Sequence, residues 1–322
     1  MQDYAQIIER NLNNCLTQTD LDLGAKRSGK VRDTYEKGDE LILVTTDRQS
    51  AFDRILASIP FKGQVLNETS AWWFEKTKHI IPNHLLTVPD PNVTIATKCS
   101  VLPVEFVVRG YITGTTETAL WTHYARGVRN YCGNELPGGL RKNEKLSHPI
   151  LTPTTKTEDH DRPISPHEII DEGLLEEEDL NKSSQAAFDL FNFGQVTTRQ
   201  HGLILVDTKY EFGKNANGDI ILIDEIHTPD SSRFWITDTY EERFANGKEP
   251  QSIDKEFLRL WFVNHCDPYG DDILPEAPED LVIELSRRYI QMFEMIIGTP
   301  FSFPGSQRSI HERIQSNLAG YL

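Results

Sequence analysis

The stretch that most constrains the fold runs from residue 202 to residue 235 and reads GLILVDTKYEFGKNANGDIILIDEIHTPDSSRFW. Residues 203–212 carry polar side chains at every second position, which is typical of a strand with one buried face. Residues 219–226 form a second apolar run, and the turn-forming residues KNANGD separate the two runs. Asn217-Gly218 is a strong hairpin signal because both residues tolerate positive φ. We therefore expect an antiparallel hairpin centred near this pair.

The expected hairpin gathers charged side chains on one face of the sheet. Asp207, Lys209 and Glu211 share that face because side chains alternate along a strand, and Asp224 falls at or near the position opposite Glu211. Opposed carboxylates repel unless a cation lies between them, and carboxylates completed by phosphate oxygens and water are common ligands of nucleotide-bound Mg²⁺. A solvent-facing side of a one-sided sheet explains the charges equally well. The TPDSSR segment favours an anion site, because Arg233 offers a planar fork to phosphate or carboxylate.

Composition limits the partners and the compartment. The 322 residues are enough for a sizeable core and two subdomains. The formal net charge of −16 argues against nucleic acid or an anionic membrane as the main partner. The four cysteines lack metal-binding spacing, so reduced thiols and a cytoplasmic location are expected. The first residues are polar instead of leader-like, and no run approaches the roughly 20 apolar residues that span a bilayer.

A basic segment near the start of the chain is a candidate phosphate site. Residues 26–32 read KRSGKVR and are expected to form a bend ahead of a strand over residues 40–46. Gly29 lacks the Cβ that keeps backbone N–H groups away from a phosphate, Lys30 adds a point charge, and Arg32 follows. A lysine-rich edge strand is the alternative interpretation. The GxxxxGK[ST] phosphate-binding loop is absent, so this bend alone is a weak signal.

Three other segments carry polar residues whose role the pattern leaves open. In the segment TDRQSAFD (46–53), residues 46–50 are expected to be a turn, and the polar side chains, among them Ser50 and Asp53, either recognise a ligand or support the turn. Residues 101–109 predict a strand ending at Arg109, which either binds an anion or pairs with Glu105 or another acid. Residues 134–162 are expected to form an irregular, lid-like loop containing Lys156. Apart from these three segments, residues 82–96 are expected to form a loop.

Six motifs in the same order resemble one enzyme family. They are GKVRDTY (29–35), TDRQSAFD (46–53), PVEFVVRGYITGT (103–115), TPTTKTEDHD (152–161), DTKYEFG (207–213) and DEIHTPDSSRFW (224–235). Together they resemble the long form of phosphoribosylaminoimidazole-succinocarboxamide synthase, or SAICAR synthetase. The resemblance implies an α+β fold in which an antiparallel-sheet N-terminal subdomain and a larger α/β subdomain close over ATP, somewhat like protein kinases and ATP-grasp enzymes. The corresponding division is residues 1–105, which bind the ATP phosphates, and residues 106–322, which bind metal and substrates and carry the C-terminal helices.

The resemblance also implies a reaction. The family joins L-aspartate to the carboxylate of carboxyaminoimidazole ribotide, uses ATP and Mg²⁺, and releases the succinocarboxamide SAICAR, ADP and phosphate. A carboxylate is a poor acylating agent because oxide is a poor leaving group, so an acyl phosphate is the expected intermediate. The partners are then small-molecule substrates, with no nucleic acid and no membrane, and the protein is expected to be a monomer or a homodimer.

Carried over motif by motif, the resemblance assigns a role to each candidate residue. ATP is expected to be bound by Gly29, Lys30, Arg32, Lys209 and Glu211, and the metal by Glu211 and Asp224. The substrates are expected to be bound by Ser50, Asp53, Arg109, Thr115, Lys156, Asp207 and Arg233. The residues expected to act in catalysis are Lys30, Lys209, Asp207 and Arg233. The base that deprotonates the aspartate amine stays open between Asp230 and a substrate phosphate.

Two other classes compete with the ligase. An ATP-dependent small-molecule kinase of related fold, such as an inositol-phosphate kinase, shares the lysine and the paired acids but should lack VVRGYITGT and TPDSSR. A protein kinase is disfavoured because HRD and DFG motifs are absent. A non-catalytic nucleotide-binding scaffold is disfavoured because Lys30, Glu211 and Asp224 are all present.

Overall fold

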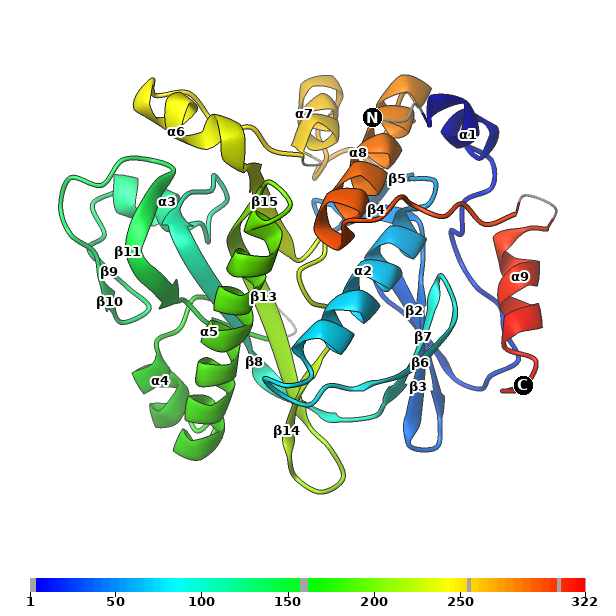
Figure 1. Ribbon diagram of the computed structural model, residues 1–322, viewed down its shortest axis with the longest axis horizontal. Coiled ribbons are helices and arrows are strands. Elements are labelled where there is room, and N and C mark those ends of the chain that lie inside the picture. Colours follow the sequence, from blue (N-terminus) through cyan, green and yellow to red (C-terminus); the bar gives the residue numbers. More distant parts are fainter. Residues whose placement is uncertain (1–3, 157–161, 254–255, 306–307, 322) are drawn as a thin grey trace. The chain divides into compact units, whose positions relative to one another are not determined.

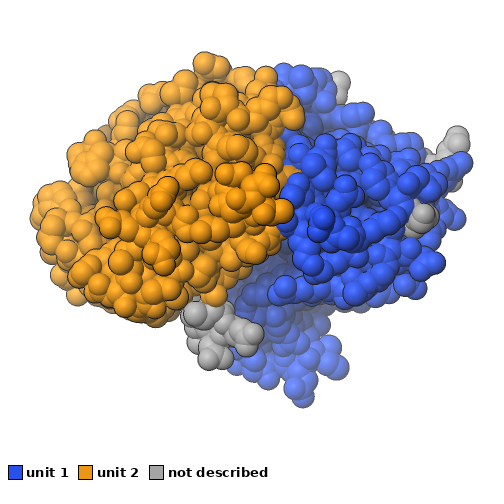
Figure 2. Space-filling model, turned by 90° about the horizontal axis from the view of Figure 1, so that it is seen from below, with its two compact units in different colours: residues 1–72, 85–98, 253–322 blue, residues 73–84, 99–252 orange. Residues whose placement is uncertain are grey.

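The computed structural model describes residues 4–156, 162–253, 256–305 and 308–321, which form helices and antiparallel sheets (Figure 1). The chain divides into two compact units, coloured separately in Figure 2. Unit 1 comprises Met1–Trp72, Leu85–Lys98 and Ile253–Leu322, and unit 2 comprises Trp73–His84 and Cys99–Ser252. The C-terminal helices therefore belong to the same unit as the N-terminal residues. The functional division at residue 105 stays a prediction.

Unit 1 contains a five-stranded antiparallel sheet in the order β1-β2-β3-β7-β6. Its strands are β1 Lys26–Ser28, β2 Arg32–Lys37, β3 Glu40–Thr45, β6 Leu85–Asp90 and β7 Val93–Thr97. The expected bend around Gly29 and the strand after it are confirmed. The expected loop over residues 82–96 was wrong, because this segment supplies β6 and β7. Its prolines read as strand breakers, but Pro89 lies in the edge strand β6, where proline is tolerated.

The remaining elements of unit 1 build its core. They are α1 Ala5–Arg10, the short hairpin β4 Arg48–Ala51 and β5 Arg54–Ser58, α2 Lys62–Thr77, α7 Glu256–His265, α8 Glu279–Ile297 and α9 Ile310–Asn317. The residues of α2 after Trp72 belong to unit 2. The α9 residues Ile310 and Ile314 are buried in one cluster with Tyr35 and Ile42 of the sheet. Helix α8 ends at Gly298 with φ 81°, the left-handed conformation that commonly ends a helix and that glycine adopts readily. The turn expected over residues 46–50 was wrong, because residues 48–50 lie in β4, which pairs with β5.

Unit 2 is built on a six-stranded antiparallel sheet. The order is β11-β8-β13-β14, with β12 also pairing with β8 and β15 with β13. The strands are β8 Ser100–Ile112, β11 Glu144–Leu151, β12 Thr154–Thr155, β13 Leu203–Lys214, β14 Ile220–Ile223 and β15 Ser232–Ile236. The predicted hairpin is confirmed as β13–β14, with Lys214 paired to Ile220. Its second strand is shorter than expected, because β14 ends at Ile223 and Asp224 turns out of the ladder with φ 64°.

Helix α5, Glu177–Arg199, packs along β13 and β8 (Figure 1). The smaller elements of unit 2 are α3 Leu120–Ala125, the hairpin β9 Asn130–Tyr131 and β10 Asn134–Glu135, α4 Pro166–Asp171 and α6 Thr237–Ala245. Helix α4 begins with a capping box formed by Ser165 and Glu168. The irregular loop expected over residues 134–162 was wrong in part, because it contains β11, and residues 157–161 lie outside the described part of the chain. None of the described helices is long and apolar enough to cross a bilayer.

Candidate active site

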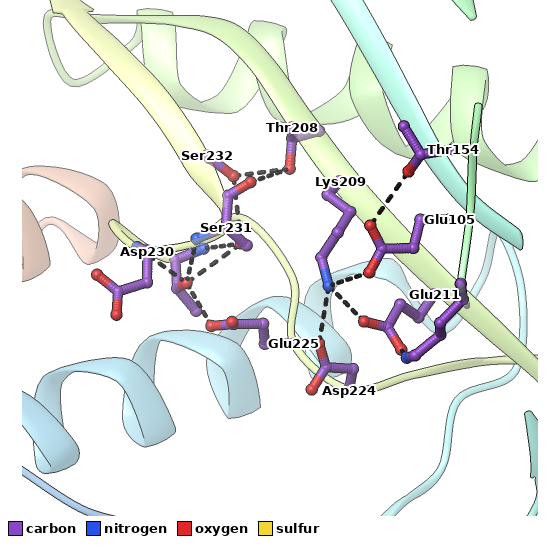
Figure 3. Close-up of polar contacts among 12 residues, drawn as sticks. Glu105, Thr154, Thr208, Lys209, Glu211, Asp224, Glu225, Asp230, Ser231 and Ser232 are labelled. Atoms are coloured by element: carbon purple, nitrogen blue, oxygen red, sulfur yellow. Dashed lines mark hydrogen bonds and ion pairs between the residues drawn. The ribbon is translucent and has the colours of Figure 1, made fainter. Parts of the chain in front are cut away.

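Five charged side chains of unit 2 meet on one face of the sheet, and we call them the carboxylate–lysine cluster. They come from β8, β13 and the residues that follow β12 and β14, and they are Glu105, Lys156, Lys209, Glu211 and Asp224. Lys209 Nζ lies 3.2 Å from Glu105 Oε1 and 3.4 Å from Asp224 Oδ2, and it also contacts Glu211 (Figure 3). Lys156 contacts the other oxygen of Glu211.

The local fold explains why these groups converge. Lys209 and Glu211 share a face of β13, and Glu211 pairs with Glu105 across the ladder to β8. Glu211 pairs with Ile223 instead of Asp224 in the hairpin. The left-handed backbone of Asp224 nevertheless lets its carboxylate reach the same lysine from the end of β14. The alternation therefore predicted the shared face, and Asp224 lies next to the residue that pairs with Glu211, which is near the opposed position as expected.

Electrostatics keep Lys209 protonated. Burial would lower the pKa of Lys209, but the carboxylates of Asp224, Glu211 and Glu105 outweigh burial and raise it well above its usual value. Burial, and then the charge of Asp224, raise the pKa of Glu211, while Lys209 and Lys156 oppose that rise. Three carboxylates face two ammonium groups, so the cluster favours an additional cation.

The oxygen donors of the cluster suit a hard divalent cation. Glu211 and Asp224 both contact Lys209 Nζ, so their carboxylates lie close enough together to share one ion. Within the residues that the structure describes, no three His, Cys, Asp or Glu side chains are arranged to hold a metal by themselves. The donor set therefore fits an ion that takes its remaining ligands from phosphate oxygens and water, which is the way Mg²⁺ usually binds with nucleotides.

A second group of charges spans three neighbouring strands of the same sheet. Asp207 on β13 pairs in register with Arg109 on β8 and with Arg233 on β15. Its Oδ2 lies 2.9 Å from Arg233 Nη1 and 3.8 Å from Arg109 Nη1. Arg109 also donates to Thr152 Oγ1 at 2.8 Å. The acid that partners Arg109 is therefore Asp207, not Glu105.

The loop after Ile112 approaches one of these arginines. Gly114 has φ 99°, and a Cβ there would lie 2.6 Å from Ala119 Cβ and 3.6 Å from Arg233 Nη1. Glycine is therefore required for the close approach. Thr115, the next residue, is exposed.

The segment between β14 and β15 is held by short polar side chains, which sequence reasoning did not single out. Thr228 Oγ1 donates to Glu225 Oε2 at 2.5 Å and accepts from the backbone N–H of Ser231 at 3.1 Å (Figure 3). Ser232 Oγ and Thr208 Oγ1 share a hydrogen bond of 2.7 Å. A threonine and serines spaced for local side chain–backbone bonds are a recognisable signal for such a turn.

In unit 1, the side chain of Arg48 holds the basic bend around Gly29 in place. Its guanidinium donates to the backbone oxygens of Gly29 at 2.9 Å and of Lys30 at 3.3 Å, and to the Asp33 carboxylate at 2.9 Å. Lys30 Nζ is 2.6 Å from Asp53 Oδ1, and both side chains are exposed. Two predicted site residues are thus brought together. Arg32, the first residue of β2, is half-buried.

Two residues of the TDRQSAFD segment support the fold. Arg48 holds the bend, and Asp47 is fully buried, where it accepts hydrogen bonds from the backbone N–H groups of Leu16 at 2.7 Å and Gly63 at 2.8 Å. Burial raises the pKa of Asp47 to about 6, against those hydrogen bonds. Ser50, in β4, is half-buried.

Comparison with known proteins agrees with the fold. Residues 25–275 match the family model described as SAICAR synthetase. A phosphoribosylaminoimidazole-succinocarboxamide synthase of Legionella pneumophila is 61% identical over 308 residues, covering 96% of this chain and 99% of the relative. The chloroplastic synthase of Arabidopsis thaliana is 59% identical over 320 residues, covering 98% and 78%.

Solved structures give the same result. The SAICAR synthase of Saccharomyces cerevisiae complexed with SAICAR has a TM-score of 0.77 at 32% identity, covering 89% of this chain and 100% of that one. A SAICAR synthetase in complex with ADP has a TM-score of 0.65 at 26% identity, covering 87% and 100%. These matches define a carbon–nitrogen ligase of purine biosynthesis and do not favour the kinase alternative. The chain belongs to the SAICAR synthetase family, as its six motifs predicted.

Proposed function

We propose that the chain uses ATP and Mg²⁺ to join L-aspartate to the carboxylate of carboxyaminoimidazole ribotide, releasing SAICAR, ADP and phosphate. The observation that carries this proposal is the convergence of Glu211, Asp224 and Lys209 on one face of unit 2. Acids that converge on a single cation position are what a nucleotide-bound metal requires. The relatives whose structures are named as complexes with SAICAR and with ADP support the two ligand classes.

The chemistry needs an activated carboxylate. Transfer of the ATP γ-phosphoryl group to the ribotide carboxylate gives an acyl phosphate, and attack of the aspartate amine on its carbonyl carbon then expels phosphate. Phosphoryl transfer depends on positioning and charge neutralisation more than on covalent help from the protein. Mg²⁺ supplies part of that neutralisation when it is bound. The chain supplies the rest through fixed cations in a partly buried site.

Three residues of the carboxylate–lysine cluster are assigned to the metal and the nucleotide. Glu211 and Asp224 would hold the metal. Lys209, which the three carboxylates keep protonated, is positioned to neutralise phosphate oxygens. Gly29, Lys30 and Arg32 of unit 1 are assigned to the ATP phosphates, because the bend offers exposed backbone and charge.

The substrate roles follow from charge. Arg109 and Arg233 are oriented by Asp207 and are assigned to the anionic groups of the ribotide, with Thr115 on the loop beside them. Lys156 is assigned to a substrate carboxylate because its ammonium already contacts the carboxylate of Glu211. Ser50 and Asp53 are assigned to the aspartate side of the reaction. The amine loses its proton either to Asp230 or to a substrate phosphate.

An omission series tests the function. Purified protein is incubated with ATP, Mg²⁺, the carboxylated ribotide and aspartate, and phosphate release is measured with each component left out in turn. We expect release only when all four are present. ADP formed with the ribotide alone, without aspartate and without free phosphate, identifies a kinase instead, because a kinase leaves the phosphoryl group on its acceptor. The cytoplasm stays the expected compartment for this reaction, although the Arabidopsis relative is chloroplastic, and a monomer or homodimer stays the expected assembly.

A further inference from the structure

The segment that links β14 to β15 carries a histidine whose function nothing above explains. His227 lies three residues after Asp224 and six before Arg233 and is fully buried. Its Nε2 lies 2.6 Å from the hydroxyl oxygen of Tyr210, and its ring meets Trp73 edge-on at a centroid distance of 4.6 Å. Tyr210 lies between Lys209 and Glu211 on β13, so its side chain points to the opposite face of the sheet.

This arrangement fixes the segment from the side away from the carboxylate–lysine cluster. The carboxylate of Asp224 points to Lys209 of the cluster. The side chain of His227 lies on the opposite, buried face of the sheet, between β13 and α5. A Cβ at Gly194 of α5 would lie 2.5 Å from His227 Cε1 and 3.0 Å from its Nδ1. The helix therefore admits the imidazole only because residue 194 is glycine. Burial lowers the pKa of His227 to about 3, so the ring is neutral at physiological pH.

The backbone of the segment shows why an anchor is needed. Asp224 has φ 64° and His227 has φ 48°, and both lie in the left-handed region that non-glycine residues rarely adopt. Such conformations persist when the surroundings over-determine them, and they concentrate at functional sites. The Tyr210 hydrogen bond, the Trp73 contact and the Gly194 recess provide that constraint at one of the two strained positions.

We propose that His227 is a positioning residue: bonded to Tyr210 in the recess at Gly194, it holds the segment so that Asp224 and Arg233 keep their places beside β13. The proposal rests on the roles given to Asp224 and Arg233 under the proposed function. His227 does not touch the substrates. It acts through the two residues that flank it.

Two variants remove the hydrogen bond in different ways. Tyr210→Phe keeps the packing and deletes only the hydroxyl, so it tests the bond without opening the recess. His227→Asn leaves an amide too short to reach Tyr210, and His227→Gln restores a polar group at about the right reach. Tyr124→Phe is the matched control, because its buried hydroxyl donates to Pro137 O at 2.8 Å elsewhere in unit 2.

The measurements are amide hydrogen exchange over residues 224–233, ribotide affinity and kcat/KM for the full-length protein. We expect Tyr210→Phe and His227→Asn to raise exchange in this segment at least tenfold and to lower kcat/KM for the ribotide about 10- to 100-fold. His227→Gln should recover part of both, and Tyr124→Phe should change neither. Unaltered exchange, or exchange that rises to the same extent in Tyr124→Phe, overturns the proposal.

A parallel Asp224→Asn variant separates the two levels of inference. If Asp224→Asn is inactive while Tyr210→Phe and His227→Asn loosen the segment at full activity, the positioning role fails and the proposed function stands. If Asp224→Asn is also fully active, the proposed role of the segment itself fails, and the positioning role fails with it.

Discussion

Replacing Asp224 with asparagine should separate stability from activity, because the carboxylate has two opposing neighbours. Its Oδ2 lies 3.4 Å from Lys209 Nζ, an attraction of about 5 kcal/mol at an effective dielectric constant of about 20. The same charge repels Glu211 and is, after burial, the second cause that raises the pKa of that residue. Asparagine removes both effects, and Lys209 keeps Glu105 and Glu211 as partners. We therefore expect the free energy of unfolding to change by no more than about 1 kcal/mol.

Activity should respond very differently. A neutral amide is a poor ligand for Mg²⁺, and the loss of one preorganised charge-stabilising group typically lowers kcat by about 100- to 1,000-fold. That loss corresponds to about 3–4 kcal/mol of transition-state stabilisation, several times the expected change in stability.

The assay compares urea unfolding with the initial rate of phosphate release at saturating Mg²⁺. Glu172→Gln is the matched control, because this exposed carboxylate of the same unit pairs with Arg162 and not with a residue of the cluster. It should alter neither quantity. Full activity of Asp224→Asn at saturating Mg²⁺ refutes the metal assignment. An activity loss that tracks unfolding refutes the claim that the residue acts in catalysis.

Three further predictions address the other groups. Arg233→Ala would remove the charged hydrogen bond that we assign to the ribotide, so ribotide affinity should fall roughly 10- to 100-fold with little change for ATP. Equal losses in calorimetry contradict the assignment. Lys30→Ala should change the free energy of unfolding by no more than about 1 kcal/mol, because the ion pair of Lys30 with Asp53 is exposed. It should raise the KM for ATP, and an unchanged KM shows that Lys30 is not part of the ATP site. Burial raises the pKa of Asp47 from 3.8 to about 6, so the free energy of unfolding should fall by roughly 3 kcal/mol as pH rises from about 4 to 6. Asp47→Asn should remove most of this pH dependence in unfolding measurements. An unchanged pH dependence shows that another group causes it.

Local patterns in the sequence predicted the parts of the site that lie on one strand. The alternation of β13 put Asp207, Lys209 and Glu211 on one face, and Asn217-Gly218 marked the turn that returns the chain toward them. Only Gly218 of that pair has positive φ. Helix ends depend on equally local signals, because the Ser165 capping box and the left-handed Gly298 each involve residues only a few positions apart.

The parts that depend on pairing between distant strands could not be predicted. Glu105 joins the cluster only because β8 pairs with β13 in one particular register. The same register places Arg109 opposite Asp207, with which it forms an ion pair. The segment containing β6 and β7 was mistaken for a loop, because its prolines are local breaker signals while its edge position is a property of the whole sheet. Tyr210 and His227 meet for the same kind of reason, through the return of the chain after β14.

The central claim is that Glu211 and Asp224 hold the metal of a bound nucleotide. The most direct test is a crystal structure of the protein with ADP and Mn²⁺, in which anomalous scattering locates the ion. We predict a peak about 2–2.5 Å from carboxylate oxygens of both residues, with the nucleotide phosphates completing the coordination. A peak elsewhere, with both carboxylates still paired to Lys209, contradicts the account.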